Sequence, residues 1–277
     1  MSILNLFKNM KKAEPATPAQ SSVTSAAEPA KTAEPAKTAE PQDDQCAANA
    51  QNEVPEGTKR VHNLLILDAS GSMISIYNPA LTGLNETLQT IRRAQEEHAG
   101  QMHFVSLIAF SSNNYKQIYR NVPAEKAADI SPEQYRPGGC TPLFDTLGRA
   151  ISELRPKVAK SDVVLVTVIT DGYENDSREY NGKAIKSLIE TMKNEGWVFT
   201  YIGANQDVEA VAASMSIDNS LAFRSDAAST QAMFACEKKS RERFFSKLDS
   251  CDSLEDLSAG YFDDDNNDAN QNRPEKS

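Results

Sequence analysis

Three short segments of the chain carry side chains that could bind a metal ion through oxygen. They are DASGS at residues 68–72, GGCTP at 138–142 and TDG at 170–172. Carboxylates and hydroxyls are hard ligands of the kind that Mg²⁺ prefers in its near-octahedral shell, where it also retains water. The side chains that would form this metal site are those of Asp68, Ser70, Ser72, Thr141 and Asp171.

Strands and a helix are expected to position these segments. Residues 61–67 and 163–169 are apolar, β-branched runs typical of buried parallel strands, and the first and third segments follow them directly. The second segment opens a helix. In an open doubly wound sheet, ligands bind outside the carboxyl ends of the strands. All three segments are therefore expected to converge at that edge of the sheet.

Strand and helix patterns alternate along the rest of the chain. Further strands are expected at 102–110, 197–202 and 220–223, and a short one at 117–122 that could lie antiparallel at an edge. Helices are expected at 78–99, 142–154, 182–195, 207–215 and 226–248. This alternation predicts an α/β fold, a doubly wound, mainly parallel sheet with helices on both faces.

In this order and at these strand ends, the motifs DASGSM, GGCTPLFD and TDGYEN resemble those of the von Willebrand factor type A (vWA) domain with a complete metal-ion-dependent adhesion site (MIDAS). The resemblance covers about Lys59 to Phe223 and implies a Rossmann-like vWA fold. It implies Mg²⁺, with Mn²⁺ or Ca²⁺ as alternatives, bound directly by the two serines and the threonine, and largely through water by the two aspartates. It also implies that an Asp or Glu carboxylate of a partner protein completes the metal shell.

Residues beside the motifs lead to further expectations. Thr141 precedes Pro142, which favours Thr141 as the N-cap of the following helix, whose amino terminus would add positive potential at the site. For Cys140, a packed thiol is expected rather than a redox site. Tyr173 and Glu174 are expected either to line the rim of the site or to be solvated loop residues.

A Mg²⁺-dependent phosphohydrolase is an alternative, because an aspartate after a first strand is also typical of phosphotransfer enzymes. Those enzymes need a second acid two residues later, where this chain has Ser70. Its three histidines are expected at the opposite end of the sheet, on the order of 20 Å away at ~3.3 Å per strand residue; they are His62, His98 and His103. No phosphate-binding glycine motif is present. We therefore expect a binding module and no enzyme.

Composition narrows the function classes. The 277 residues include 39 acidic and 29 basic ones, for a net charge of −10, which disfavours nucleic acid because its recognition needs a clustered basic face. The four cysteines show no paired spacing, which is typical of a reduced cytoplasm, and no stretch reaches the ~18 apolar residues of a transmembrane helix. The first twelve residues lack the apolar run of an export signal. A cytoplasmic protein, similar to bacterial intracellular vWA proteins, is therefore expected, with its oligomeric state left open.

Five regions are predicted along the chain. Residues 1–12 are predicted to form a short amphipathic segment, and whether it docks to a protein, docks to a membrane surface or has no docking role is left open. Residues 13–58 are predicted to form a disordered linker rich in Ala, Pro, Glu, Lys and Thr. A vWA domain at 59–225, a C-terminal helix at 226–250 and an acidic disordered tail at 251–277 follow. A scaffold or regulatory protein that acts through its N-terminal segment is thus a further alternative.

Overall fold

The computed structural model describes residues 57–250, 257 and 260–262. The docking segment predicted at 1–12, nearly all of the linker predicted at 13–58 and most of the tail predicted at 251–277 lie outside these residues.

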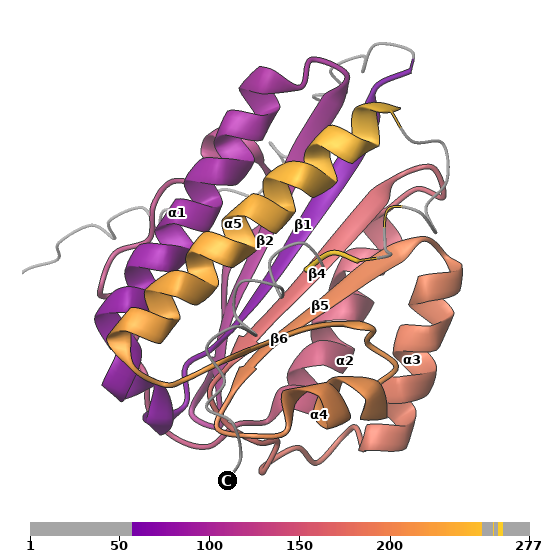
Figure 1. The fold of residues 1–277 in the computed structure, drawn as a ribbon. Coiled ribbons are helices and arrows are strands. Elements are labelled where there is room, and N and C mark those ends of the chain that lie inside the picture. Colours follow the sequence, from indigo (N-terminus) through magenta and orange to yellow (C-terminus); the bar gives the residue numbers. More distant parts are fainter. Residues whose placement is uncertain (1–56, 251–256, 258–259, 263–277) are drawn as a thin grey trace, which may run out of the picture. The chain divides into compact units, whose positions relative to one another are not determined.

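Six strands form one sheet in the order β3-β2-β1-β4-β5-β6 (Figure 1). All neighbouring pairs are parallel except β2 and β3, which pair antiparallel and place β3 at an edge. The strands are β1 (Lys59–Asp68), β2 (Gln101–Ser111), β3 (Asn114–Pro123), β4 (Val163–Thr170), β5 (Trp197–Ala204) and β6 (Asn219–Phe223). The predicted doubly wound, mainly parallel sheet is confirmed, as is its antiparallel edge strand.

Helices cover both faces of this sheet. Figure 1 shows α1 and α5 side by side on one face, with α2, α3 and α4 on the other. Their bounds are α1 (Tyr77–Glu97), α2 (Leu143–Leu154), α3 (Gly182–Asn194), α4 (Val208–Ser214) and α5 (Ala227–Ser250). The two layers follow from the strand alternation, since Leu65 and Leu67 of β1 belong to the core under α1 and α5, whereas Leu64 and Ile66 belong to the core under α2 and α3.

The strand order reverses between β1 and β4, the two central strands. From β1 the chain crosses through α1 to β2 on one side, and the later strands β4, β5 and β6 continue on the other side. Leu67 of β1 lies opposite Ile169 of β4, so Asp68 and Thr170 follow at adjacent strand ends. This reversal is the point where open α/β sheets bind their ligands.

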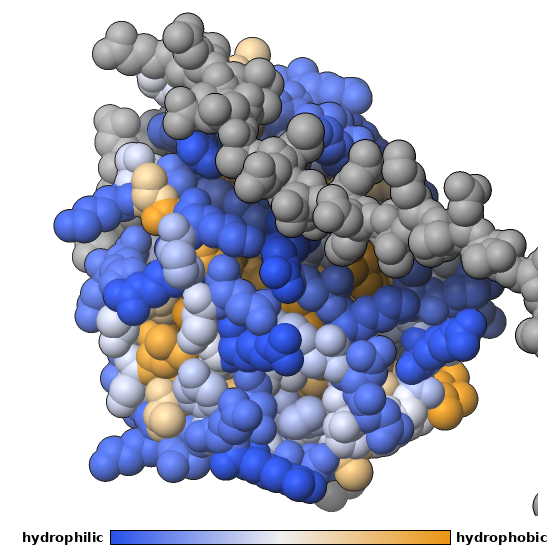
Figure 2. Space-filling view, turned by 180° about the vertical axis from the view of Figure 1, so that it is seen from behind, coloured by the Kyte–Doolittle hydropathy of each residue, from blue (hydrophilic) through white to orange (hydrophobic). Residues whose placement is uncertain are grey.

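The face of the molecule seen in Figure 2 is largely polar. Figure 2 shows the molecule from behind relative to Figure 1, where hydrophilic side chains dominate and apolar ones appear in small separate areas. Among the helices of the described region, none is both long enough and apolar enough to cross a membrane.

The core under α1 and α5 includes residues beyond the end of α5. Leu257, Tyr261 and Phe262 are all less than 5% exposed and belong to the same apolar cluster as Phe244 and Phe245 of α5. This differs from the disordered tail predicted from residue 251. The physical reason is that these three apolar side chains pack into the core under α1 and α5 and leave water, whereas the acidic composition of the segment as a whole dominates its sequence pattern.

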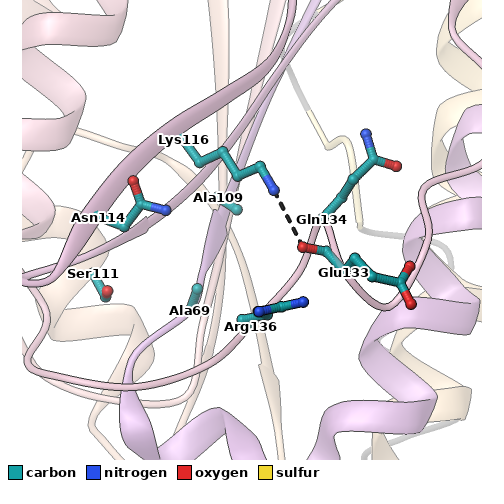
Figure 3. Close-up of a pocket in the computed structure, with 8 residues that line it drawn as sticks. All are labelled: Ala69, Ala109, Ser111, Asn114, Lys116, Glu133, Gln134 and Arg136. Carbon is teal, nitrogen blue, oxygen red and sulfur yellow. Dashed lines mark hydrogen bonds between the residues drawn. The ribbon is translucent and has the colours of Figure 1, made fainter.

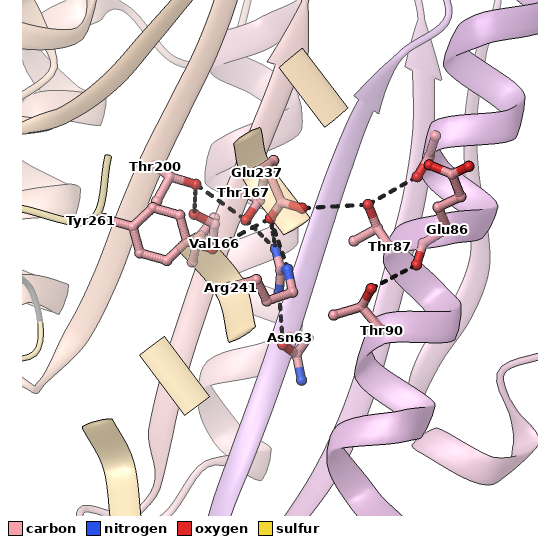
Figure 4. Close-up of polar contacts among 11 residues, drawn as sticks. Asn63, Glu86, Thr87, Thr90, Val166, Thr167, Thr200, Glu237, Arg241 and Tyr261 are labelled. Carbon is pink, nitrogen blue, oxygen red and sulfur yellow. Dashed lines mark hydrogen bonds and ion pairs between the residues drawn. The ribbon is translucent and has the colours of Figure 1, made fainter. Parts of the chain in front are cut away.

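A fully buried arginine joins α5 to the sheet. Arg241 donates to the Glu237 carboxylate at 2.7 Å, to Asn63 Oδ1 of β1 at 2.8 Å and to Thr167 Oγ1 of β4 at 2.7 Å (Figure 4). The Tyr261 hydroxyl donates to Glu237 as well, at 3.3 Å. Because the guanidinium and the carboxylate neutralise each other and their hydrogen bonds are largely satisfied, this network fixes the position of α5 over β1 and β4.

We predict that Arg241→Ala lowers the free energy of unfolding by about 3 to 5 kcal/mol, because it leaves the Glu237 carboxylate buried without its cation. Urea unfolding measures this change. Arg155→Ala is the control, since Arg155 forms an exposed ion pair with Glu195 and should cost less than about 1 kcal/mol. Equal losses in the two variants would contradict this role for Arg241.

Candidate metal site

Asp68 ends β1 with its carboxylate held in a defined orientation. One carboxylate oxygen accepts a hydrogen bond from the Ser70 backbone N–H at 2.6 Å, and the other accepts one from the Thr170 hydroxyl at 2.6 Å. The Asp68 backbone carbonyl accepts a further bond from the buried Tyr135 hydroxyl at 2.9 Å. Three elements thus position this residue, and its side chain is fully buried.

The two serines and Asp171 come together at the same edge. Ser70 Oγ lies 3.1 Å from Ser72 Oγ, and the Ser72 hydroxyl donates to Asp171 Oδ1 at 2.5 Å. Ser70 has an extended backbone conformation, and a 3-10 helix begins at Gly71, so the two hydroxyls point to one side.

Thr141 faces this group from the loop before α2. A Cβ placed on Gly172 would lie 3.7 Å from Ser72 Oγ and 3.8 Å from Thr141 Oγ1, so both hydroxyls border the space beside this glycine. The Thr141 hydroxyl makes no hydrogen bond to another residue in the described part of the chain. It therefore remains available as a ligand.

The place of Thr141 before Pro142 predicts that Thr141 is the N-cap of the following helix. This prediction is wrong. The helix α2 begins at Leu143, with Pro142 in the capping position and no side-chain cap from that residue. The Thr141 backbone instead bonds to Asn175, whose side chain accepts from the Thr141 N–H at 2.8 Å. This loop contact holds the threonine one residue outside the helix, which leaves its hydroxyl directed elsewhere.

The amino terminus of α2 is occupied by side chains of the loop after β4. Glu174 accepts from the Phe144 N–H at 2.8 Å, and Ser177 Oγ accepts from the Asp145 N–H at 3.0 Å. In return, the Asp145 carboxylate accepts from three backbone N–H groups of residues 178–180. The predicted contribution of this helix to the positive potential of the site is therefore largely cancelled by the Glu174 carboxylate. Glu174 thus joins the loop after β4 to the first turn of α2.

Two glycines let the 138–141 loop run against the first motif. Gly138 donates to the Ala69 carbonyl at 2.8 Å, and Gly71 donates to the Gly139 carbonyl at 2.9 Å. Gly139 has a φ of +87°, and a Cβ there would lie 2.5 Å from Ser112 Oγ. Any other residue would be strained and would clash, so this close approach depends on glycine.

Burial disfavours the ionised forms of the Asp68 and Asp171 carboxylates. Burial raises the pKa of Asp68 to about 6 in the metal-free protein, opposed by the hydrogen bonds from Thr170 and Ser70. Burial also raises the pKa of Asp171. No ion pair joins either carboxylate to a Lys, Arg or His within the described residues. A bound cation would remove this cost, because an adjacent positive charge favours the ionised form.

The five residues fit a divalent cation by their chemistry. They contribute three hydroxyls and two carboxylates, and the threonine hydroxyl has no hydrogen-bond partner among the described residues. A cluster of three or more His, Cys, Asp or Glu side chains, which a softer or more acidic site would use, does not occur among the described residues. Ser72 is exposed whereas the other four are buried, so the side open to solvent lies at Ser72.

Sequence reasoning missed the residues that orient the aspartates. Thr170 and Tyr135 hold Asp68, while Asn205 donates to the Asp171 carbonyl at 3.0 Å and the Ser225 hydroxyl donates to Asp171 Oδ2 at 3.3 Å. Thr170 was detectable as a polar residue at a strand end. The other three come from loops far away in the sequence, where no local pattern marks them.

The histidines lie away from the site, as expected. His62 and His103 occur near the starts of β1 and β2, and His62 contacts Asp162 at 3.0 Å. His98 follows α1 and contacts Asp249 at 2.5 Å. Burial lowers the pKa of His103 to about 3. These contacts give the histidines structural partners at the other end of the sheet.

Two neighbours of the motifs are exposed. The packed thiol expected at Cys140 is wrong, because this residue is exposed, and its N–H donates to Ser112 Oγ at 2.8 Å. The Cys140 side chain is exposed to solvent, while its backbone bonds to Ser112, the residue after β2. Tyr173 is 54% exposed.

We predict that the metal-free stability of the wild type, relative to that of Asp68→Asn, falls as pH rises from about 4 to about 6. The folded pKa of about 6 exceeds the ordinary value of 3.8, so the folded state binds the extra proton and loses this advantage as pH rises. The difference in free energy of unfolding between the wild type and Asp68→Asn should change by about 3 kcal/mol over this pH range. Urea unfolding with chelator present measures it.

Comparing the two variants is necessary, because the depressed pKa of His103 acts in the opposite direction in both of them. Asn is a fair replacement since the Thr170 hydroxyl, which also contacts the Gly172 carbonyl at 3.1 Å, can accept from the new amide. Parallel pH profiles for the two proteins would refute the prediction.

No family model matches the sequence, and no curated protein matches it. Solved structures of similar arrangement include the PilB minor pilin from Streptococcus sanguinis, with 14% identity and a TM-score of 0.48 over 68% of this chain and 62% of that one. A von Willebrand factor type A protein from Catenulispora acidiphila has 14% identity and a TM-score of 0.48 over 67% of this chain and 43% of that one. The von Willebrand factor domain of the type V pili tip protein Mfa5 from Porphyromonas gingivalis has 10% identity and a TM-score of 0.47 over 67% and 96%.

This chain thus spans less than two thirds of the length of the first two structures. At these identities and TM-scores the likeness concerns the general arrangement of strands and helices, and it carries no information on ligands or partners. The fold class itself rests on the strand order and pairing of this chain, which are those of a doubly wound α/β sheet.

Proposed function

We propose that this chain is a vWA-type protein-binding module whose MIDAS holds Mg²⁺ and captures a carboxylate of a partner protein. The observation that carries the proposal is the convergence of three hydroxyls and two buried carboxylates at the strand-order reversal. The ligand set is Ser70, Ser72 and Thr141 for direct contact, with Asp68 and Asp171 acting largely through water and hydrogen bonds. Mn²⁺ or Ca²⁺ are alternatives to Mg²⁺.

The hydroxyl and carboxylate side chains have different roles in the proposed site. When bound, the ion supplies a positive centre that attracts an incoming Asp or Glu side chain. Neutral serine and threonine hydroxyls leave more of that charge uncompensated than several directly bound carboxylates would. Asp68 is already held by Ser70 and Thr170, so it is suited to orienting the neighbouring groups rather than to moving toward the ion.

Two exposed apolar residues support a protein as the partner. Ile74 is 63% exposed and Tyr173 is 54% exposed, and they are the large apolar side chains that stand out to solvent in the described part of the chain. Ile74 lies two residues after Ser72, and Tyr173 lies two residues after Asp171. Apolar contacts beside a carboxylate-binding centre are typical of protein interfaces, where aromatic residues are enriched.

A cytoplasmic location in a bacterial cell remains a proposal drawn from the cysteine spacing and the vWA resemblance. Action through residues 1–12 also remains open as an alternative, since that segment lies outside the described residues.

We predict that Mg²⁺ raises the Tm of the purified protein and permits capture of a protein partner, and that both effects are lost in Thr141→Ala and with chelator. Thr141→Ser, which keeps the hydroxyl, is the matched control and should retain both effects. Differential scanning calorimetry with Mg²⁺ alone and affinity capture with the immobilised full chain measure them.

Two results would count against this proposal. Capture that persists in chelator and in Thr141→Ala, but disappears when residues 1–12 are deleted, would assign the partner to the N-terminal segment. A Tm insensitive to Mg²⁺, Mn²⁺ and Ca²⁺ in the wild type would show that the five residues hold no divalent ion.

We also propose that the site binds without catalysis, because the three histidines lie at the far end and Ser70 occupies the place of a second acid. Purified protein with Mg²⁺ or Mn²⁺ should therefore hydrolyse p-nitrophenyl phosphate no faster than the Asp68→Ala variant. Turnover that this substitution abolishes would instead establish a phosphohydrolase.

A further inference from the structure

A small pocket with two cationic side chains lies next to the first metal-site motif. Its volume is about 50 Å³, and it is bordered by Ala69 and Ala109 together with polar residues of the β2–β3 hairpin and of the loop before residue 138 (Figure 3). A buried water needs roughly 10 to 15 Å³. The pocket therefore has room for a carboxylate group. Ala69 is the residue between Asp68 and Ser70, so the pocket adjoins the proposed metal site.

The two cations approach the pocket from separate elements. Lys116 comes from β3 and donates to the backbone carbonyl of Glu133 at 3.3 Å, which leaves it with further ammonium donors (Figure 3). Arg136 is exposed and comes from the loop that leads to Gly138. Its guanidinium has no hydrogen bond or ion pair within 4 Å to any other residue of the described region.

Two hydrogen bonds to the backbone carbonyls of residues 68 and 69 fix this loop beside the metal site. The residue before Arg136 is the buried Tyr135, whose hydroxyl donates to the Asp68 carbonyl at 2.9 Å. Two residues after Arg136, the Gly138 N–H donates to the Ala69 carbonyl at 2.8 Å. Arg136 is therefore anchored on both sides to the strand end that carries Asp68, and only its side chain is free to meet a partner.

The charge of the pocket contrasts with that of the whole chain. The chain has a net charge of −10, which repels an acidic partner at long range. Among the residues that line the pocket, Glu133 is the acidic one, and its pKa is lowered by a hydrogen bond from Ser131 and, to a smaller extent, by Arg136. Its carboxylate is fully exposed and points away from Lys116 in Figure 3. The cations thus remain available.

We infer that Lys116 and Arg136 form a second, cationic subsite, which binds a carboxylate of the partner one to a few residues away from the one bound at the metal. This inference rests on the proposed function and names the partner class as an acidic peptide segment with two carboxylates. An extended peptide advances ~3.3 Å per residue, so a short spacing spans two neighbouring subsites. Arginine is suited to this role because its planar guanidinium can donate two parallel hydrogen bonds to one carboxylate.

Blocked peptides of Gly and Ser, with acetylated and amidated ends, test this subsite. One peptide carries a single Glu, and a series carries two Glu residues separated by zero to four residues. Kd values come from NMR titration of the full chain with saturating Mg²⁺. At least one two-Glu peptide of the series should bind about 5- to 10-fold more tightly than the single-Glu peptide.

Arg136→Gln and Lys116→Gln should each remove most of this gain while leaving the Kd of the single-Glu peptide unchanged. Lys186→Gln, an exposed residue of α3, changes the net charge equally and should leave the gain intact. A gain that survives in Arg136→Gln, or that disappears equally in Lys186→Gln, would overturn the subsite.

Failure of the underlying function has a different signature. If the single-Glu peptide binds equally well with chelator, or if Thr141→Ala leaves its Kd unchanged, the metal does not receive a carboxylate and the proposed function is wrong. If that peptide binds in a Mg²⁺-dependent manner and no spacing of two Glu residues binds more tightly, the metal site stands and the second subsite is wrong.

Discussion

The parallel pairing of β1 with β4 is the constraint on which the rest of this structure depends. Because the strand order reverses between these two strands, their crossover helices go to opposite faces and leave the carboxyl ends uncovered. Asp68 and Thr170 end the two strands side by side, and the next residue, Asp171, completes the pair of carboxylates. Every other part of the candidate site is a loop that reaches this point.

Two groups of buried charge in the described part of the chain differ in how they are compensated. Under α5, Arg241 and Glu237 neutralise each other and bond to both central strands. At the carboxyl edge, burial raises the pKa of Asp68 and Asp171, and no cationic side chain among the described residues pairs with either carboxylate. The first arrangement is complete within the protein and serves stability. The second is compensated only by an added cation, which is the physical basis for proposing a metal there.

Much of the fold was predictable because each element carries its own periodic signal. The apolar run at 163–169 and the helical spacing at 78–99 depend on neighbours within a few residues, and the structure contains β4 and α1 there. Local signals failed where a distant group decides the outcome. Thr141 is not an N-cap because Asn175 holds its backbone, and Cys140 is exposed because its loop bonds to Ser112. Metal binding itself stays a prediction.

The sequence by itself determined the α/β class, the alternation of strands and helices, and the three oxygen-bearing segments, since these follow from short-range patterns of residue type. The tertiary structure alone decided how close the hydroxyls lie and which loop residues, such as Asn205 and Ser225, hold Asp171. It also decided that Lys116 and Arg136 share one pocket beside Ala69. The physical reason is that these contacts join residues distant along the chain, which only the sheet order and the packing of loops bring together.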